Sequence, residues 1–248
     1  MARRDNHPRV GVVPTRVLNA AVSVVIPIYN EVGSLERVVG GVAAALPELA
    51  VEHEIVLVDD GSSDGSGAIV DRLVAESSVV KAFKHDKRQG YGAALRTGFA
   101  AASKDWVVLF PADGQFDISE LRGLLQRGSS ADLVVGYRRL RRDGIVRALN
   151  AWLWNRAVRL RVGYLCQDID CGFKLFRREI FDQVRLSCDS AAIDTELLMQ
   201  ARSQGYVIDE IEVTHRPRLA GRASGAEIGV ILRAVRDLLG LRRPLSAG

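Results

Sequence analysis

Acidic side chains follow three apolar segments of the chain, and carboxylates grouped in this way can hold a cation or a nucleoside. The acidic stretches are PIYNE (27–31), DDGSSDG (59–65) and PADGQFD (111–117). Carboxylates repel a diphosphate unless a divalent cation lies between them, and Mg²⁺ and Mn²⁺ prefer oxygen ligands. Glu31, Asp59 and Asp60 are also candidates to accept hydrogen bonds from a pyrimidine or guanine base. Any one of these acids is equally well explained as a turn former, but three such stretches favour a metal-assisted nucleotide site.

The elements that must position these acids alternate along the chain. β-Branched runs at residues 21–28, 54–58, 106–110 and 132–135 are too short for helices and predict buried parallel strands. Helical spacing covers residues 34–46, where Ser34 is a plausible N-cap, and recurs at 66–75 and 92–102. This order predicts an α/β fold with a doubly wound, mixed but mainly parallel sheet flanked by helices. Ligands of such folds bind beyond the carboxyl ends of the strands.

The composition is that of a globular protein with one large domain. Of the 248 residues, 48% are hydrophobic and 26% are charged, which excludes a disordered or fibrous chain. The three cysteines form no C-x-x-C pair, so we expect neither a disulfide framework nor a zinc knuckle. The longest uncharged run, 17–30, is shorter than the about 20 apolar residues of a spanning helix, and no apolar signal region follows the N-terminus. We expect a cytoplasmic location.

Positive charge is concentrated in two segments. Residues 137–161 hold eight Arg and one Asp, and residues 214–248 hold seven Arg with one Asp and one Glu, although the net charge of the chain is only +4. Acidic and basic regions in one chain favour an anionic ligand bound between them, or an anionic surface facing the basic region. A nucleic-acid partner is not expected, because the clusters contain no recognition motif and the predicted cleft is acidic.

Four familiar site motifs fit this chain poorly. No Gly-Lys dipeptide occurs, which excludes a P-loop, and GYGAALRTG (90–98) has only the first two glycines of a dinucleotide fingerprint. GSSDG (61–65), followed by Asp194 and His215, matches a hydrolase nucleophile elbow, but only one strand precedes it to supply an oxyanion loop. The same stretch begins like a calcium loop but lacks its final Glu and its upstream helix.

Taken together, the motifs resemble those of family-2 glycosyltransferases with the A-type, Rossmann-like nucleotide-sugar fold. The resemblance rests on PIYNE, VDDGSSDG, the segment 90–98, ADGQFD and DIDCGFKLFRR (168–178). Within the family the chain is most similar to polyprenyl (dolichyl) phosphate sugar synthases. This implies inverting transfer of a hexose from a GDP- or UDP-sugar to a polyprenyl phosphate. The resemblance covers residues 21–225, which we expect to form the glycosyltransferase domain. The flanking sequence predicts a flexible segment 1–20 and, from its stripe of apolar residues, an amphipathic C-terminal helix and tail 226–248.

The resemblance also implies roles for individual residues. The nucleotide sugar is expected to contact Pro27, Tyr29, Glu31, Asp59, Asp60, Ala112, Asp113, Arg138, Arg218 and Arg222. The expected ligands of Mg²⁺ or Mn²⁺ are Asp113 and Gln115. They stand in the family's D-x-D-x-Q motif, whose first Asp is Pro111 here, so we expect weaker metal binding than in relatives with both acids.

Catalytic roles are expected for Asp113, Asp168, Asp194 and Arg218. Asp113 with its metal, together with Arg218, would stabilise the departing diphosphate. Asp168 and Asp194 would orient the acceptor phosphate or help remove its proton, or they would cap helices. A phosphate acceptor is already ionised at neutral pH, so no strong general base is required. The family's Gly-Lys-Gly is Gly90-Tyr91-Gly92 in this chain, and its R-x-x-G-x-S-K loop, 218–224 here, lacks the lysine.

A membrane-bound acceptor requires a surface that holds the protein at the membrane. Apolar residues at helical spacing alternate with arginines between 145 and 161, which predicts a helix lying in the membrane interface; these apolar residues are Ile145, Leu149, Trp152 and Leu153. A core-facing helix and a membrane-protein partner are the alternatives. The chain would then be peripheral, on the cytoplasmic face. Two alternatives for function stay open, a non-catalytic or partner-dependent nucleotide-sugar-binding subunit and a family-2 glycosyltransferase with a different acceptor.

Overall fold

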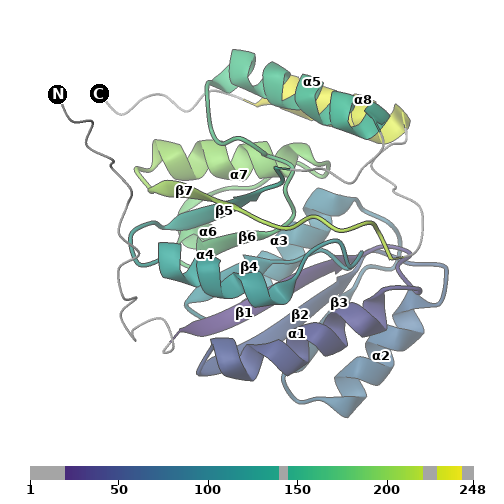
Figure 1. Ribbon diagram of the computed structural model, residues 1–248. Helices are drawn as coiled ribbons and strands as arrows, with labels where there is room; N and C mark the ends of the chain where they lie inside the picture. The colour runs from purple at the N-terminus through teal and green to yellow at the C-terminus, as the bar shows by residue number, and fades with distance from the viewer. Residues whose placement is uncertain (1–19, 140–144, 220–227, 242–248) are drawn as a thin grey trace.

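A seven-stranded sheet with the order β3-β2-β1-β4-β6-β5-β7 forms the centre of the computed structural model (Figure 1), which describes residues 20–139, 145–219 and 228–241. The strands are β1 (Ala21–Ile28), β2 (Glu52–Asp59), β3 (Val80–Lys84), β4 (Trp106–Leu109), β5 (Leu133–Tyr137), β6 (Lys174–Arg177) and β7 (Ile208–Glu212). All neighbouring strands are parallel except β6, which runs antiparallel to both β4 and β5. The predicted mixed, mainly parallel α/β sheet is confirmed.

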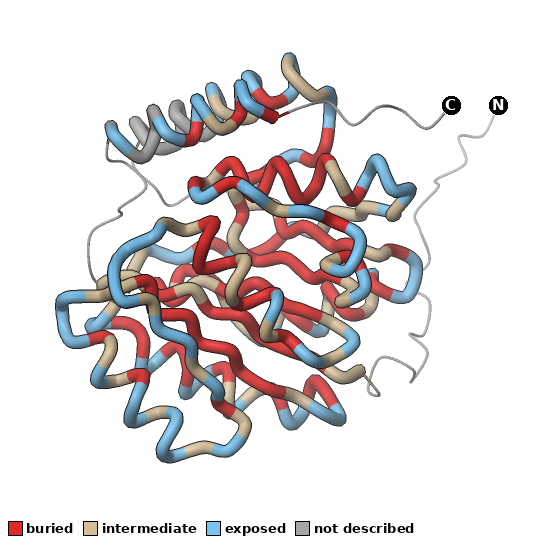
Figure 2. Tube along the Cα trace, turned by 180° about the vertical axis from the view of Figure 1, so that it is seen from behind, coloured by how far each residue is buried: buried red, intermediate tan, exposed pale blue. Residues whose placement is uncertain are grey.

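Helices cover both faces of this sheet. They are α1 (Leu35–Leu49), α2 (Ser66–Glu76), α3 (Tyr91–Ala101), α4 (Leu121–Arg127), α5 (Ile145–Val162), α6 (Ile180–Gln183), α7 (Ala192–Ser203) and α8 (Ile228–Gly240), with a short 3₁₀ turn η2 (Ile118–Glu120) before α4. Side chains alternate along each strand, so Val24 joins the core cluster under α1 and α4, whereas Val25 joins the cluster under α3 and α7. Figure 2 shows the resulting buried strands between more exposed helices.

The buried stripe of α1 explains why this segment is helical. Its buried residues recur at three- and four-residue spacing: Leu35, Val38, Val39, Val42, Leu46 and Leu49. Ser34 does occupy the N-cap position, but its hydroxyl donates to Glu31 and does not cap the helix. The predicted cap position is therefore confirmed, while its hydrogen bond serves the loop after β1.

Helices α5 and α8 lie side by side in an outer layer above α7 (Figure 1). Val158 of α5 and Leu238 of α8 are buried in the same core cluster as α7. Neither these two helices nor any other within the described residues is long and apolar enough to cross a membrane. Residues 1–19 of the predicted N-terminal segment and the tail 242–248 lie outside the described residues.

The carboxyl ends of β1, β2 and β4 lie at one edge of the sheet. Ile28, the last residue of β1, pairs with Asp59, the last residue of β2, and the β1–β4 pairing ends at Leu109. The three acidic stretches follow these strand ends directly. The parallel topology therefore brings together side chains that are about 80 residues apart in the sequence.

Candidate functional site

Arg218 joins two carboxylates that follow different strands. Its Nη1 atom donates to Oε1 of Glu31 at 2.8 Å, and its Nη2 atom lies 3.3 Å from Oδ2 of Asp113. Glu31 follows β1 and Asp113 follows β4, so neighbouring strand ends supply the two acids. The side chains are at most 20% exposed, which strengthens the electrostatic interaction between them. A cation thus lies between two acids at the edge of the sheet.

The segment after β7 places Arg218 by pairing with the loop after β4. The backbone N–H of Arg216 donates to the carbonyl of Gln115 at 2.8 Å, and that of Leu219 donates to the carbonyl of Asp113 at 3.2 Å. Gly114 has a φ of +73°, and a Cβ atom there would lie 2.2 Å from Leu219 Cδ1. Only glycine permits this close approach.

Asp113, Gln115 and Glu31 offer oxygen atoms suited to a hard cation. Oδ1 of Asp113 accepts a hydrogen bond from the backbone N–H of Gln115, and the Gln115 side chain uses its nitrogen to bind the Arg216 carbonyl, which leaves its amide oxygen out of that bond. Within the described residues, no group of three or more His, Cys, Asp or Glu side chains forms a preassembled metal site. Carboxylate and amide oxygens are the donors that suit a hard divalent cation such as Mg²⁺ or Mn²⁺, which also accepts water and substrate oxygens.

Burial raises the pKa of Glu31 above its usual range, and the positive charge of Arg218 counteracts part of this increase. Asp113 adds to the increase because two carboxylates repel one another. Any cation that replaces Arg218 between these acids would favour the ionised form of Glu31.

The adjacent acids Asp59 and Asp60 both shape the loops at this edge. Oδ1 of Asp59 accepts a hydrogen bond from the backbone N–H of Ser62 at 3.0 Å. The Asp60 carboxylate accepts from the backbone N–H groups of Gln89 and Gly90, each at 2.8 Å, and lies 2.8 Å from Nδ1 of His85. Both acids are almost fully buried. Asp60 thus holds the loop that leads into α3.

A second group of charges lies beyond the ends of β5 and β4. Arg138 binds Asp168 with two hydrogen bonds, Nε to Oδ2 at 2.7 Å and Nη2 to Oδ1 at 2.9 Å. Lys174 of β6 donates to Asp194 of α7 at 2.6 Å, and both side chains are almost completely buried. Burial lowers the pKa of Lys174, but Asp194, Cys171 and Cys166 together raise it above its usual value, so Lys174 keeps its positive charge.

Residues 23–185 match the family described as "Glycosyl transferase family 2". The chain belongs to this family. It is 33% identical over 204 residues to an undecaprenyl-phosphate 4-deoxy-4-formamido-L-arabinose transferase of Aeromonas hydrophila, covering 82% of this chain and 62% of the relative. It is 33% identical over 230 residues to the glycosyltransferase AglD of Haloferax volcanii, covering 89% and 35%. The chain thus spans less than two thirds of these two relatives.

A third relative is matched over most of its length. It is the polyprenol monophosphomannose synthase of Mycolicibacterium smegmatis, with 33% identity over 229 residues, covering 83% of this chain and 82% of the relative. A crystal structure of glucosyl-3-phosphoglycerate synthase from Mycobacterium tuberculosis superposes with a TM-score of 0.69 at 22% identity, covering 89% of this chain and 79% of that one. That likeness confirms the A-type glycosyltransferase fold.

The other predicted donor-side residues of this family-2 chain lie in varied surroundings. The Tyr29 ring is covered by the Arg88 guanidinium, 4.2 Å from the ring centre. Pro27 lies in β1 beyond its last pair with β4, where a missing N–H costs no strand hydrogen bond. Ala112 is buried in the core cluster under α1 and α4. Arg222 lies outside the described residues.

The family-2 site also contains residues that the sequence analysis did not single out. These are Asp170 and Lys174 of the second charged group. Tyr91 also interacts with Asp194 and Asp170 of that group, and His215, considered above only for a hydrolase, is buried with its ring 5.5 Å from that of Phe116. A lysine inside an apolar strand is a usable sequence signal, because it must find an acidic partner when buried. The second Asp of Asp168-Ile169-Asp170 is another such signal.

Proposed function

We propose that this family-2 chain transfers a hexose, with inversion, from a GDP- or UDP-sugar to a polyprenyl phosphate. The observation that carries the proposal is the Arg218 bridge between Glu31 and Asp113, because it places a cation between two acids at the strand ends. Two relatives whose names include a polyprenyl carrier support the acceptor class. Solved structures of the same fold in complex with Mn²⁺ and UDP-glucose support the donor class.

On the donor side, Arg218 and Asp113 would stabilise the leaving diphosphate. A bound Mg²⁺ or Mn²⁺ would supply positive charge opposite the diphosphate oxygens. Nε of Arg218 is buried and makes no hydrogen bond to any described residue, so this guanidinium has a donor to offer an incoming anion. Tyr29 and Arg88 would contact the base, while Asp59 and Asp60 hold the loops around it.

On the acceptor side, the chain would orient a phosphate that needs little activation. Arg138 and Lys174 are bound to Asp168 and Asp194, so these four residues form a fixed electrostatic frame. A single displacement by a phosphate oxygen at the anomeric carbon inverts its configuration. This frame lies beside the loop after β4, residues 111–117, which we call the donor loop. Gly172, which lies between Asp168 and Lys174 in the sequence, packs against Pro111 of that loop.

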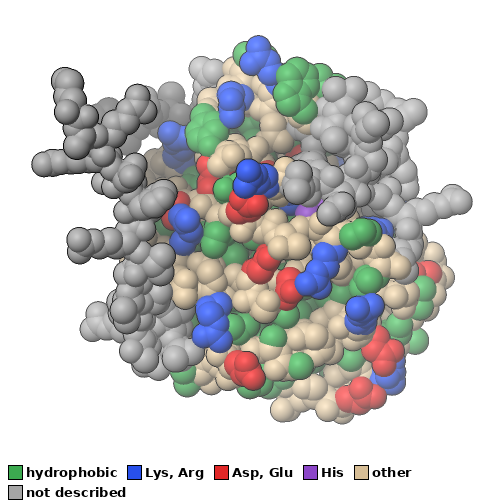
Figure 3. Space-filling view, viewed as in Figure 1, with side chains coloured by type: hydrophobic (Ala, Val, Ile, Leu, Met, Phe, Trp, Pro, Cys, Tyr) green, Lys and Arg blue, Asp and Glu red, His purple; other side chains and the backbone are tan. Residues whose placement is uncertain are grey.

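Helix α5 would bring the protein to the cytoplasmic face of a membrane. Trp152, Leu153 and Leu160 are 59%, 51% and 69% exposed, and Figure 3 shows hydrophobic and basic side chains together at the top of the molecule. Trp154 of the same helix packs toward the core, while the side chains of Ile145 and Leu149 are outside those described. Exposed apolar and basic groups on one helix suit an anionic lipid surface.

The test of the proposed reaction is transfer of labelled sugar from a panel of GDP- and UDP-sugars. Purified protein, polyprenyl phosphate and Mg²⁺ or Mn²⁺ are incubated, and label is counted in the organic phase. Label that disappears with a chelator and in Asp113→Asn would support the proposal and identify the donor. Label on a water-soluble phosphate acceptor would instead assign a different acceptor, and nucleotide-sugar binding without transfer would assign a partner-dependent or non-catalytic subunit.

Membrane contact has a separate test. We expect the protein to sediment with vesicles containing anionic lipid, and we expect salt to release it. The double variant Trp152→Ser/Leu153→Ser should lose this binding, whereas Val51→Ser, which changes an exposed apolar residue before β2, should keep it. Equal sedimentation of both variants would argue against α5 as the contact.

A further inference from the structure

Three carboxyl groups and two basic groups from four parts of the chain lie together beside the donor loop. The members are Asp168 and Asp170 in the segment before β6, Lys174 in β6, Asp194 in α7 and Arg138 after β5. If all five were ionised, the group would carry a net charge of −1. A buried group of this composition needs one further proton or one further positive charge to be neutral.

Asp170 is the member that has no fixed partner. Asp168 is held by Arg138, and Asp194 is held by Lys174. Within the described chain, no hydrogen bond or ion pair to the Asp170 side chain is formed. Asp170 is also partly exposed, whereas Asp168 and Asp194 are 5% and 4% exposed. The unpartnered carboxyl group is therefore the one that a ligand can reach.

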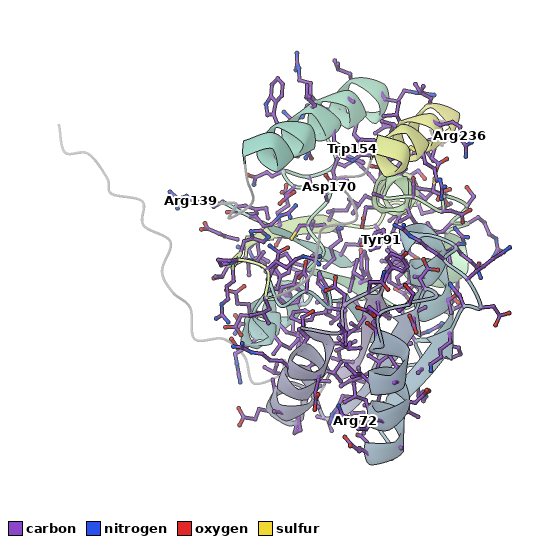
Figure 4. All side chains as sticks on the ribbon, turned by 90° about the vertical axis from the view of Figure 1, so that its right-hand side faces the viewer. Arg72, Tyr91, Arg139, Trp154, Asp170 and Arg236 are labelled. Atoms are coloured by element: carbon purple, nitrogen blue, oxygen red, sulfur yellow. The ribbon has the colours of Figure 1, made fainter. Side chains whose placement is uncertain are left out.

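Asp170 lies close to the loop proposed to bind the donor and to the helix proposed to face the membrane-bound acceptor. Gly172, two residues later, packs so tightly against Pro111 that a Cβ atom would lie 2.5 Å from the proline Cγ. The N–H of Ile169 donates to Asn155 of α5 at 3.2 Å. Figure 4 shows Asp170 between Trp154 of α5 above and Tyr91 of α3 below. Asp170 thus lies between the donor loop and the helix proposed to face the membrane.

The surroundings of Asp170 bring the pKa of its carboxyl group close to neutral pH. Burial, followed by the negative charges of Asp168 and Asp194, raises its pKa from 3.8 to about 7, although Arg138 and Lys174 counteract the increase. The charged and titratable groups that interact with it come from several elements: Tyr91, Arg138, Asp168, Lys174 and Asp194. The Asp170 carboxyl group can therefore gain or lose a proton near pH 7.

The acceptor must lose any proton it carries during glycosyl transfer. A phosphate monoester has a second pKa of about 6, and a negatively charged site favours its protonated form. The product is a phosphate diester, which has no second ionisation. We propose that Asp170 is a catalytic residue that contacts the acceptor phosphate and takes up its proton during transfer. This inference rests on the proposed function and specifies the acceptor end of the same site.

The step balances in atoms and charge. An unprotonated oxygen of the acceptor phosphate forms the bond to the anomeric carbon, and the bond from that carbon to the nucleoside diphosphate breaks. The proton on a second phosphate oxygen moves to the Asp170 carboxylate. The bonding electrons leave with the diphosphate, and Asp170 ends the step neutral, from which it returns the proton to solvent when the product departs.

The kinetic test compares Asp170→Asn with the wild type from pH 6 to pH 9. We expect the variant to transfer sugar about 10²-fold more slowly at pH 6.5, and the deficit to shrink at least tenfold by pH 9, where the acceptor is fully ionised. Asp170→Glu should restore most of the rate, and Asp182→Asn, at an exposed surface pair, should match the wild type. Unchanged melting temperature shows that each variant folds. A deficit independent of pH would overturn the proposal.

A binding test separates this inference from the proposed function. Calorimetry in buffers of different ionisation enthalpy measures proton uptake when a short prenyl phosphate binds at pH 7. We expect the wild type to take up a fraction of a proton that Asp170→Asn does not, because the ionised Asp170 carboxylate favours the protonated form of the acceptor phosphate bound beside it. Uptake without sugar transfer would refute the proposed function but keep the contact. Equal uptake by both proteins would refute the role of Asp170.

Discussion

The donor-side and acceptor-side charges of this chain are held in different ways. On the donor side, Glu31 and Asp113 share one arginine that is 187 and 105 residues away in the sequence. On the acceptor side, Lys174 and Asp194 form a buried ion pair whose side chains are at most 5% exposed. A shared arginine can be exchanged for another cation when a ligand arrives. The two charges of a buried ion pair cannot separate without leaving each of them away from water and from its partner.

This difference indicates which half of the site changes when substrate binds. Under the proposed function, the donor acids would release Arg218 to the diphosphate, and Glu31 and Asp113 would hold a metal ion in its place. The acceptor-side frame would keep its geometry and be preorganised for the incoming phosphate. Asp170, beside that frame, has no fixed partner among the described residues.

The strongest test of the contrast is to break one pair on each side. We expect Lys174→Met to lower the free energy of unfolding by about 4 kcal/mol, because it leaves the buried Asp194 carboxylate without its cation. Arg218→Met should cost much less, since Glu31 and Asp113 can reach water. Urea denaturation measures both values. Lys84→Met, at an exposed pair with Asp71, serves as the control and should change stability by under about 1 kcal/mol. Equal losses for Lys174→Met and Arg218→Met would remove the contrast.

On the donor side, the expected loss is in activity. We expect Asp113→Asn to reduce transfer about 10³-fold with little change in stability, because the amide keeps the shape but loses the charge opposite the cation. Initial rates with saturating acceptor, together with a melting curve, measure both quantities. Asp117→Asn, four residues later at an exposed pair with Arg216, is the control. A variant that retains the wild-type rate would exclude Asp113 from the reaction.

The pH dependence of stability sharpens the comparison on the acceptor side. Because the pKa of Asp170 is raised from 3.8 to about 7, the folded chain binds more protons than the unfolded chain between these values, and stability falls as pH rises through this window. We expect Asp170→Asn to remove about 2 kcal/mol of the decrease between pH 5 and pH 7. Denaturant midpoints across that range test this. Parallel curves for variant and wild type would contradict it.

The smallest predicted effect concerns the missing acid of the metal motif. We expect Pro111→Asp to lower the metal concentration needed for half-maximal activity about tenfold, because a second carboxylate joins Asp113. Titration with Mn²⁺ at fixed donor concentration measures the change. Pro111→Ala, which removes the ring without adding charge, is the matched control. Unchanged metal dependence in Pro111→Asp would show that position 111 does not reach the cation.

Much of the fold could be predicted from local pattern. Strand β1 begins and ends where its β-branched run does, and the predicted α1, α2 and α3 each lie within a few residues of the observed helices. Strands β3, β6 and β7 were not predicted because each contains charged residues: Lys81, Lys84, Lys174, Arg177, Asp209, Glu210 and Glu212. Charge in a strand is tolerated at a sheet edge, as in β3 and β7, or with a buried partner, as in β6.

The site was less predictable than the fold. Motif resemblance selects Glu31, Asp113 and Arg218, and the structure brings these three together. Motif resemblance cannot show that the Asp60 carboxylate is occupied by the loop that leads into α3, nor that Arg138 is bound to Asp168, because both facts depend on contacts about 30 residues apart. Long-range pairing decides whether a charged residue faces a ligand or another residue.

The antiparallel insertion of β6 has a consequence for the order of assembly during synthesis. Strands β1 to β4 pair among themselves and can associate as soon as residue 109 has been made. Strand β6 fills the place between β4 and β5, so the sheet cannot be completed until the excursion through α5 has returned at residue 174. Lys174 then waits for Asp194 before its charge is neutralised. We therefore expect the donor half to fold first, with the acceptor half closing late and controlling the overall folding rate.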